Sequence, residues 1–304
     1  MERNITLDYF KVLLSIFVIT VHIGPLTASY PHLNWLISQG LGRITVPCFF
    51  IINGYYLVKK IDDNKAMKKY ILHLLLIYAV WSTIYISLYI KEINLITLLE
   101  YCAFGILHLW YVAALISGSI LFFLVKKIVK KDNVLLILSI VILLVGIFLE
   151  PFRGEYLFVV RNGFFIGFPF VFLGYYIHAK NLVNKVKNIY LTPLVVLSFI
   201  ALCVESSFAR LTGFYHDLYF SQIIFCPAVL LFVFKHSHYK KNNTYLTYLG
   251  SLASAIYFIH YFVIIMLADI EMPYMIIRFA IVLLLSIFLS VLIIYINKRI
   301  KIFL

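Results

Sequence analysis

The sequence predicts an all-α protein, a polytopic bundle of about ten transmembrane helices with both chain ends on the cytoplasmic side. Of its 304 residues, 63% are hydrophobic and only 13% are charged. No soluble core could hide that much apolar surface. The apolar residues also gather in stretches near the length of about 20 residues that a helix needs to cross a bilayer. The sequence therefore predicts a multi-pass protein of the plasma membrane.

Ten apolar stretches can be followed in chain order, and polar or basic segments separate them. The first five are residues 7–24, 39–58, 70–90, 107–125 and 133–149. The second five are residues 163–179, 189–205, 218–234, 249–268 and 274–296.

The distribution of basic residues tests this assignment, because cytoplasmic loops of membrane proteins hold an excess of Lys and Arg. With the N-terminus inside, 20 of the 26 Lys and Arg residues fall on the inner side. The exceptions are Arg43, Lys91, Arg153, Arg161, Arg210 and Arg278. The N-in, C-in topology follows, and short loops facing anionic headgroups account for the net charge of +13. A nucleic-acid partner is not expected, and the lipid bilayer is.

The rest of the composition indicates one transmembrane domain over residues 1–304, without an internal repeat or an attached soluble catalytic module. Cys48, Cys102, Cys203 and Cys226 lie in or beside predicted spans. They lack the spacing of a metal site or a disulfide framework, so we expect packing roles and no metal. We interpret the acidic residues of the outer loops as solvated charges: Glu92, Glu100, Glu150, Glu155, Glu205, Asp217, Asp269 and Glu271.

Ionisable groups inside a membrane span are costly and usually mark a functional site. Lys11 and His22 both lie on the first predicted helix. Eleven residues advance a helix by nearly whole turns and about 16 Å, so the two side chains share one stripe at different depths. His22 falls near the outer end, beside Gly24-Pro25, and Lys11 near the inner interface.

Other polar residues point toward the outer half of the predicted bundle. Arg43 lies near the outer end of the second helix, where the stretch Arg43–Pro47 is expected to open locally and expose backbone carbonyls. His108-Leu109-Trp110-Tyr111 and Arg161-Asn162-Gly163 begin two further helices, and His260 lies at about mid-depth in another. The alternative is that the cations snorkel to headgroups and the aromatic residues form an interfacial belt.

A neutral imidazole suits His22 to general base catalysis, because its ordinary pKa near 6.5 lets it take a hydroxyl proton near neutral pH. No Gly-x-Ser-x-Gly elbow is present, so direct transfer to an acceptor hydroxyl is the simpler scheme. Arg43 or Arg161 could stabilise an oxyanion or hold an anionic acceptor. On the inner side, Lys11, Lys68 and Lys69 suit phosphate binding, although the loop lysines also fit the positive-inside rule alone.

These residues resemble the acyltransferase-3 family of membrane proteins, which transfer acyl groups from cytoplasmic acyl-CoA to extracytoplasmic acceptors such as glycans. Leu7-Asp8-x-x-Lys11 with His22 matches the family's opening Leu-Asp-x-x-Arg element and its His eleven residues later. The run Val46–Tyr55 matches its Val-Pro-x-Phe-Phe-x-x-Ser-Gly-Tyr pattern. Weaker landmarks lie at His108–Tyr111, Arg161–Gly163, Gly174-Tyr175 and Tyr257–His260.

Four residues depart from the family pattern. Lys11 stands where the family usually has Arg, and Lys68-Lys69 replace an Arg-rich segment. Lys keeps the charge but loses the planar fork that grips phosphate with two hydrogen bonds. Asn53 replaces a small hydroxyl residue.

The resemblance implies acetyl-CoA or another acyl-CoA as the donor, an acetyl group as the expected cargo, and a hydroxyl of a cell-surface glycan as the acceptor. It assigns catalysis to His22, Asp8 and Arg43, and donor binding to Lys11, Lys68 and Lys69. Acceptor binding is expected at His108, Trp110, Tyr111, Arg161, Asn162 and His260. Homo-oligomerisation stays open.

A second resemblance leads to an alternative function. The run from His22 to Leu26 and the Arg161–Gly163 element are similar to the membrane domain of vancomycin-resistance serine racemases, which is associated with serine supply to or across the membrane. This resemblance implies a transporter for a small solute such as L-serine. No racemase follows Leu304 here, so we expect a free-standing relative or an excised membrane domain. A third alternative is a structural partner that uses Gly163-x-x-x-Gly167 for helix packing.

Overall fold

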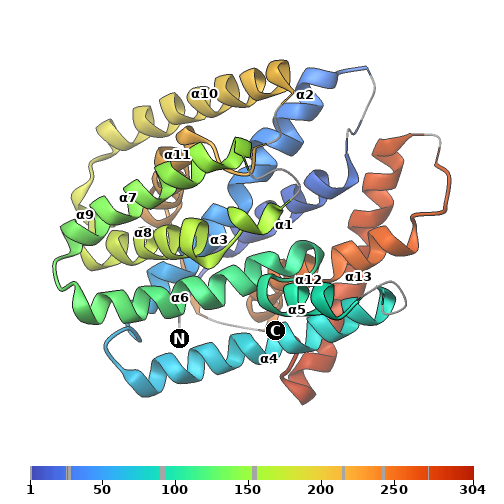
Figure 1. Cartoon of the computed structure of the whole chain (residues 1–304), viewed down its shortest axis with the longest axis horizontal. Coiled ribbons are helices and arrows are strands. Elements are labelled where there is room, and N and C mark those ends of the chain that lie inside the picture. The colour runs from blue at the N-terminus through green and yellow to red at the C-terminus, as the bar shows by residue number, and fades with distance from the viewer. Residues whose placement is uncertain are drawn as a thin grey trace. The chain divides into compact units, whose positions relative to one another are not determined.

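The computed structural model describes residues 2–24, 26, 29–89, 94–152, 156–213, 216–241, 244–272 and 274–304. Eight helices in these ranges are long and apolar enough to cross a membrane. Figure 1 shows that the chain is built mainly of helices. The shorter apolar helices Gly163–Ala179 and Phe220–Lys235 occupy the two remaining predicted spans. The all-α, multi-pass fold is therefore confirmed, whereas the N-in, C-in orientation stays a prediction.

The elements follow one another along the chain with few interruptions. In the first half they are β1 (Glu2–Asn4), α1 (Ile5–Ile23), α2 (Pro31–Trp35), the π-helical η1 (Leu36–Leu41), η2 (Gly42–Ile44), α3 (Thr45–Leu57), α4 (Asn64–Tyr89), α5 (Leu95–Phe104), η3 (Leu107–Leu109) and α6 (Trp110–Ile128). In the second half they are α7 (Asp132–Leu149), η4 (Glu150–Phe152), η5 (Leu157–Val159), the π-helical η6 (Gly163–Gly167), α8 (Phe168–Ala179), α9 (Leu182–Lys185), α10 (Asn188–Thr212), α11 (Phe220–Lys235), β2 (Tyr239–Lys241), α12 (Thr244–Met266) and α13 (Met275–Ile300).

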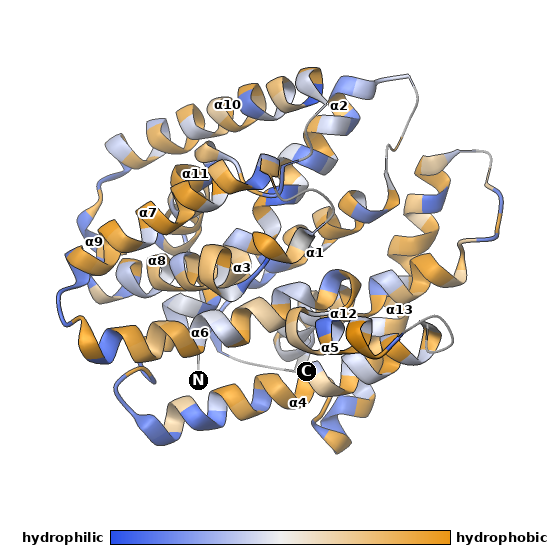
Figure 2. Cartoon of the chain, in the orientation of Figure 1, coloured by the Kyte–Doolittle hydropathy of each residue, from blue (hydrophilic) through white to orange (hydrophobic). Residues whose placement is uncertain are grey.

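Hydrophobic residues cover the long helices, and hydrophilic residues gather at helix ends and in loops, as Figure 2 shows. This is the pattern that a bilayer requires, because a helix satisfies its own backbone hydrogen bonds inside hydrocarbon. Pro25, Lys91, Glu92, Arg153 and Glu155, on which parts of the sequence prediction fall, lie outside the described residues.

The chain divides into two compact units, and the first comprises Met1–Thr45, Ser206–Tyr215 and Val233–Leu304. Its core lies where α1 and α12 pack together and α13 packs against both. Ile19, Ile256 and Val282 belong to one buried apolar cluster at this contact. The three helices thus form the interior in which His22 and His260 are placed.

A small antiparallel sheet joins the start of this unit to the segment before α12. Strand β1 pairs with β2, with Arg3 opposite Lys240. The Ile5 N–H donates to the His238 carbonyl at 2.9 Å. Asn4 caps α1, since its side-chain oxygen accepts the Leu7 N–H at 3.0 Å. These contacts fix the first turn of α1, which carries Asp8, one turn before Lys11.

The second unit comprises Val46–Glu205 and His216–Phe232, and close glycine contacts define its interior. A β-carbon added to Gly54 of α3 would overlap the Val171 carbonyl of α8. The glycines of the Gly163-x-x-x-Gly167 motif lie against α6, where an added β-carbon would overlap Ser117 or the Ala114 carbonyl. The motif therefore packs helices within the chain.

Candidate active site

At the N-terminal end of α1, Asp8 holds two cations. Its carboxylate accepts the Arg3 Nε at 2.5 Å and the Lys11 Nζ at 2.6 Å. Asp8 is 3% exposed. One carboxylate compensates two positive charges, so the cluster keeps a net charge of about +1. Sequence reasoning found Asp8 and Lys11 but missed Arg3, which only the pairing of β1 with β2 brings into position.

His22 lies at the opposite end of α1, in its last turn, and is partly buried. Its ring centroid lies 5.4 Å from that of His260 and 5.0 Å from that of Tyr261, both on α12. Fourteen residues of helix separate His22 from Asp8, or about 21 Å. The structure thus brings His22 and His260 together and keeps Asp8 well beyond hydrogen-bond reach of His22. Tyr261 was not among the sequence-based candidates.

His260 is fully buried, and its backbone contacts fix its tautomer. Its Nδ1 lies 2.7 Å from the Tyr257 carbonyl and 3.1 Å from the Ile256 carbonyl. Carbonyl oxygens only accept hydrogen bonds, so we assign the proton of the neutral ring to Nδ1. The Nε2 atom then carries the lone pair.

Ser15 joins the two helices that carry the histidines. Its hydroxyl lies 2.9 Å from the Ala253 carbonyl of α12 and 3.0 Å from the Lys11 carbonyl of its own helix. Ser15 is fully buried. A buried hydroxyl shared between two carbonyls fixes the separation of α1 and α12, and with it the separation of His22 and His260.

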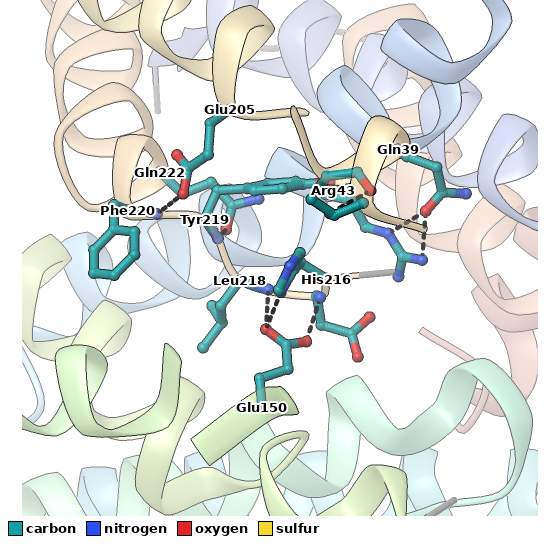
Figure 3. Close-up of polar contacts among 12 residues, drawn as sticks. Gln39, Arg43, Glu150, Glu205, His216, Leu218, Tyr219, Phe220 and Gln222 are labelled. Carbon is teal, nitrogen blue, oxygen red and sulfur yellow. Dashed lines mark hydrogen bonds and ion pairs between the residues drawn. The ribbon is translucent and has the colours of Figure 1, made fainter. Parts of the chain in front are cut away.

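Arg43 lies in the single turn η2, just after the π-helical turn η1. Its Nε and Nη2 donate to the Gln39 side-chain oxygen at 2.8 and 2.6 Å, as Figure 3 shows. The predicted opening over Arg43–Pro47 is wrong, because helical structure continues from Pro31 to Leu57. The irregularity lies earlier, in the wide turn Leu36–Leu41. One extra residue in a π-turn keeps the helix continuous while changing its register.

In the second unit, Arg161 forms an ion pair with Asp217 and a cation–π contact with Trp110. Its Nε and Nη2 donate to the two Asp217 carboxylate oxygens at 2.6 and 2.8 Å. The guanidinium lies 5.5 Å from the Trp110 ring centroid, a cation–π contact. Burial lowers the pKa of Arg161, but the Asp217 and Glu150 carboxylates raise it more, so the net direction is upward. This positive charge is therefore permanent and already compensated.

Two of the outer carboxylates are buried, which corrects their interpretation as solvated charges. Glu150 is 2% exposed and Asp217 is 7% exposed. Glu150 accepts the N–H groups of Asp217 and Leu218, the latter at 3.2 Å, and lies 3.6 Å from the His216 Nδ1 (Figure 3). A buried carboxylate persists where backbone N–H groups satisfy it. By contrast, Glu100 is exposed, as expected.

The aromatic landmark on α6 is buried and bonded within the protein. Tyr111 is 7% exposed, and its hydroxyl accepts the Asn53 Nδ2 at 3.1 Å. The Tyr70 hydroxyl donates to the Asn53 Oδ1 at 3.4 Å. His108 is 2% exposed, and its ring meets the Tyr85 ring edge-on at 4.9 Å. Asn53, which replaces a hydroxyl residue of the family pattern, thus links two tyrosines by using both ends of its amide.

Asn162 caps a helix with its whole amide. Its Nδ2 donates to the Phe158 and Val159 carbonyls, each at 2.9 Å. Its Oδ1 accepts the N–H groups of Phe164 and Phe165 at 2.8 and 2.9 Å. Two donors and two lone pairs are the full capacity of the amide. Asn162 has nothing left to offer a substrate, so its contribution is to start η6.

The lysines of the second unit that were expected to bind the acyl donor are exposed, unlike Lys11. Lys68 and Lys69 are exposed near the start of α4. Lys60 lies in the preceding turn, with its Nζ 4.6 Å from the Tyr70 ring centroid. Burial lowers the pKa of Lys60. Within the described ranges, no group of three or more His, Cys, Asp or Glu side chains could hold a metal ion.

Comparison with known proteins finds a matching family and several related proteins. The profile of the acyltransferase-3 family, described as an acyltransferase domain, matches residues 4–295. A serine/alanine racemase of Enterococcus gallinarum is 29% identical over 268 residues, which cover 76% of this chain and 37% of the racemase. An amino-acid racemase of Enterococcus faecalis is 27% identical over 259 residues, which cover 74% of this chain and 36% of that protein.

The chain therefore spans little more than a third of the length of these relatives. No solved structure matches it. The family profile covers nearly the whole chain, including α1 with His22 and α12 with His260. This chain is a multi-pass membrane protein that belongs to the acyltransferase-3 family of membrane acyltransferases.

Proposed function

We propose that the protein is an integral membrane O-acyltransferase that moves an acyl group, expected to be acetyl, from cytoplasmic acyl-CoA to an extracytoplasmic hydroxyl, as on a cell-surface glycan. Family membership supports acyl transfer in general. The observation that carries the proposal is the His22–His260 pair, with ring centroids 5.4 Å apart between two apolar helices. Titratable rings are costly in such a setting and indicate a functional site.

His22 acts as the general base in this proposal. Its neutral imidazole takes the proton of the acceptor hydroxyl as the oxygen attacks the thioester carbonyl carbon. The tetrahedral intermediate collapses, the C–S bond breaks, and the imidazolium returns the proton to the leaving thiolate. The products are the acyl ester and free CoA, so atoms and protons balance. Arg43, oriented by Gln39, is proposed to stabilise the oxyanion.

His260 is proposed to position His22. Its Nδ1 lies 2.7 Å from the Tyr257 carbonyl, which fixes the orientation of the ring. The ring centroid lies 5.4 Å from that of His22, so the His260 ring limits the orientations that the His22 imidazole can take. This role replaces direct acceptor binding, because the His260 ring is fully buried.

On the donor side, we propose that Lys11 and Arg3 meet the phosphates of acyl-CoA. Asp8 holds both cations, so we assign it a positioning role and not a step in the chemistry. Its distance of about 21 Å along the helix from His22 supports this revision. Lys68 and Lys69 stay candidates for the same donor, because both are exposed cations.

The test is acyl transfer by purified protein in lipid nanodiscs, with radiolabelled acetyl-CoA and a panel of glycan acceptors. His22→Ala should lower transfer at least about 100-fold, the usual contribution of a general base. His73→Ala, which removes an exposed histidine of α4, is the matched control and should leave the rate unchanged. Equal thermal unfolding of the two variants shows that folding is intact. Undiminished transfer by the His22 variant refutes the assignment.

A transport function for a small solute such as L-serine is the second candidate, because the chain resembles the membrane domain of vancomycin-resistance serine racemases and is 29% identical to a serine/alanine racemase over 268 residues. It requires no acyl donor. Proteoliposomes containing the protein would take up radiolabelled L-serine without acyl-CoA, and His73→Ala would not change that uptake. Uptake equal to that of empty liposomes, together with acyl transfer, rejects this candidate.

A further inference from the structure

A cavity of about 400 Å³ opens within the second unit, beside the end of α5, the face of α6 and the start of η6. Its walls include Phe104, Ala114, Leu121 and Phe164, with Arg161 as the charged group. The volume lies in the range of about 300–1,000 Å³ that small-molecule sites occupy. Small residues such as Ala114 create the space, and aromatic and aliphatic side chains make its walls apolar.

Few polar atoms remain for a ligand in this cavity. Asn162 lines it, but both ends of its amide are bonded to backbone groups. Ser117 lines it and donates its hydroxyl proton to the Ala113 carbonyl at 2.8 Å. Arg161 has five N–H groups, and its two contacts with Asp217 engage two of them. Arg161 is therefore the wall residue with hydrogen-bond donors to spare.

The charge of the cavity argues against an anionic ligand. Asp217 compensates Arg161 through both carboxylate oxygens, and Glu150 adds a second negative charge close to the pair. Two carboxylates beside one guanidinium leave no uncompensated positive charge in the cavity wall. A carboxylate or phosphate entering the cavity would leave water without gaining a compensating charge. An uncharged oxygen loses less hydration and still accepts a hydrogen bond from the guanidinium.

We infer that this cavity binds the hydrocarbon chain of an uncharged, hydroxyl-bearing amphiphile, with its oxygen accepting from Arg161. The inference rests on the proposed function and names a class for the acceptor: one carried on a hydrocarbon chain, without an anionic group at the Arg161 end. At about 30 Å³ for each small group, the volume of about 400 Å³ accommodates about 13 such groups, enough for a ten-carbon chain with its hydroxyl. From the sequence, Arg161 was one of two arginines expected to stabilise an oxyanion or to hold an anionic acceptor, whereas its ion pair with Asp217 favours an uncharged ligand.

The experiment is photoaffinity labelling of the wild-type protein in nanodiscs at pH 8 without any acyl donor. The probes are decan-1-ol carrying a mid-chain diazirine and decanoic acid carrying the same group. We expect saturable labelling of peptides containing residues 103–121 and 161–164 by the alcohol. Unlabelled decanol should compete, and the ionised acid should label these peptides at least fivefold less.

Ala103→Phe fills the exposed end of the cavity and should lower this labelling at least fivefold. Ala79→Phe, at an exposed alanine of α4 outside the cavity lining, is the matched control and should not change it. Equal or stronger labelling by the acid overturns the inference. So does unsaturable labelling spread evenly over other apolar helices such as α10 and α13, which would mean bulk lipid contact only. No acyl transfer is measured, so this result stands apart from the test of His22.

Discussion

Replacing Asp217 with Asn removes the negative charge that faces Arg161 while keeping the shape of the side chain. Breaking a buried ion pair by removing one partner costs about 3–5 kcal/mol, because the other charge is left uncompensated. The Arg161 side chain is 21% exposed, so water recovers part of this loss. We therefore expect Asp217→Asn to lower the free energy of unfolding by about 2–3 kcal/mol.

The assay is unfolding of the purified protein in mixed micelles, followed by circular dichroism as SDS is added. Asp269→Asn, at an exposed outer-loop aspartate, is the control and should change stability by less than about 0.5 kcal/mol. Adding Arg161→Gln to Asp217→Asn should recover part of the lost stability, because the double variant no longer contains a guanidinium without its paired carboxylate, while Glu150 keeps its backbone N–H donors. If Asp217→Asn and Asp269→Asn have equal effects, the pair does not hold the guanidinium as described.

Three further perturbations follow from the structure. Gly54→Val should destabilise the protein by about 3 kcal/mol or more, because the side chain overlaps the α8 backbone; Gly146→Ala, which meets only a side chain at 3.3 Å, should cost less than about 1 kcal/mol in the same SDS-unfolding assay. Asp8→Asn should cost about 2 kcal/mol at 0.1 M salt and less at 1 M, because screening relieves the repulsion of its two cations; a salt-independent loss contradicts this. The Asp132 hydrogen bond raises the pKa of Lys180 above 10.5, so the contact stabilises the fold below pH 10.5 and is lost as pH rises further; the melting temperatures of wild type and Lys180→Gln should converge there, and a constant difference contradicts the assignment.

The spans could be predicted from sequence because hydrophobic length and loop charge are local properties. The stretch 163–179 and the helix Gly163–Ala179 agree at both ends. The helix α5 was missed, since ten residues are too few to span a bilayer. The three-residue strands were missed for a similar reason: pairing of Glu2–Asn4 with Tyr239–Lys241 depends on residues more than 200 positions apart.

For the candidate site, too, the sequence predicts local spacing along one helix but not the contacts between helices. Helical spacing placed Lys11 and His22 on one stripe, but spacing says nothing about partners on other helices. His260 was recognised as unusual, whereas its contact with His22 depends on how α1 and α12 pack. Asn162 was expected to bind the acceptor because it belongs to the Arg161–Gly163 element of the family resemblance. Only the structure shows that both ends of this amide already form hydrogen bonds with neighbouring backbone groups.

The boundaries of the two units have a consequence for how the protein can be taken apart. The backbone passes from one unit to the other four times, between residues 45 and 46, 205 and 206, 215 and 216, and 232 and 233. Three of these passages fall within or at the edge of the helices α3, α10 and α11. No single proteolytic cut can therefore release either unit as one fragment, and neither can be expressed alone as one uninterrupted gene segment. An engineered version that keeps one unit intact therefore has to keep the other as well.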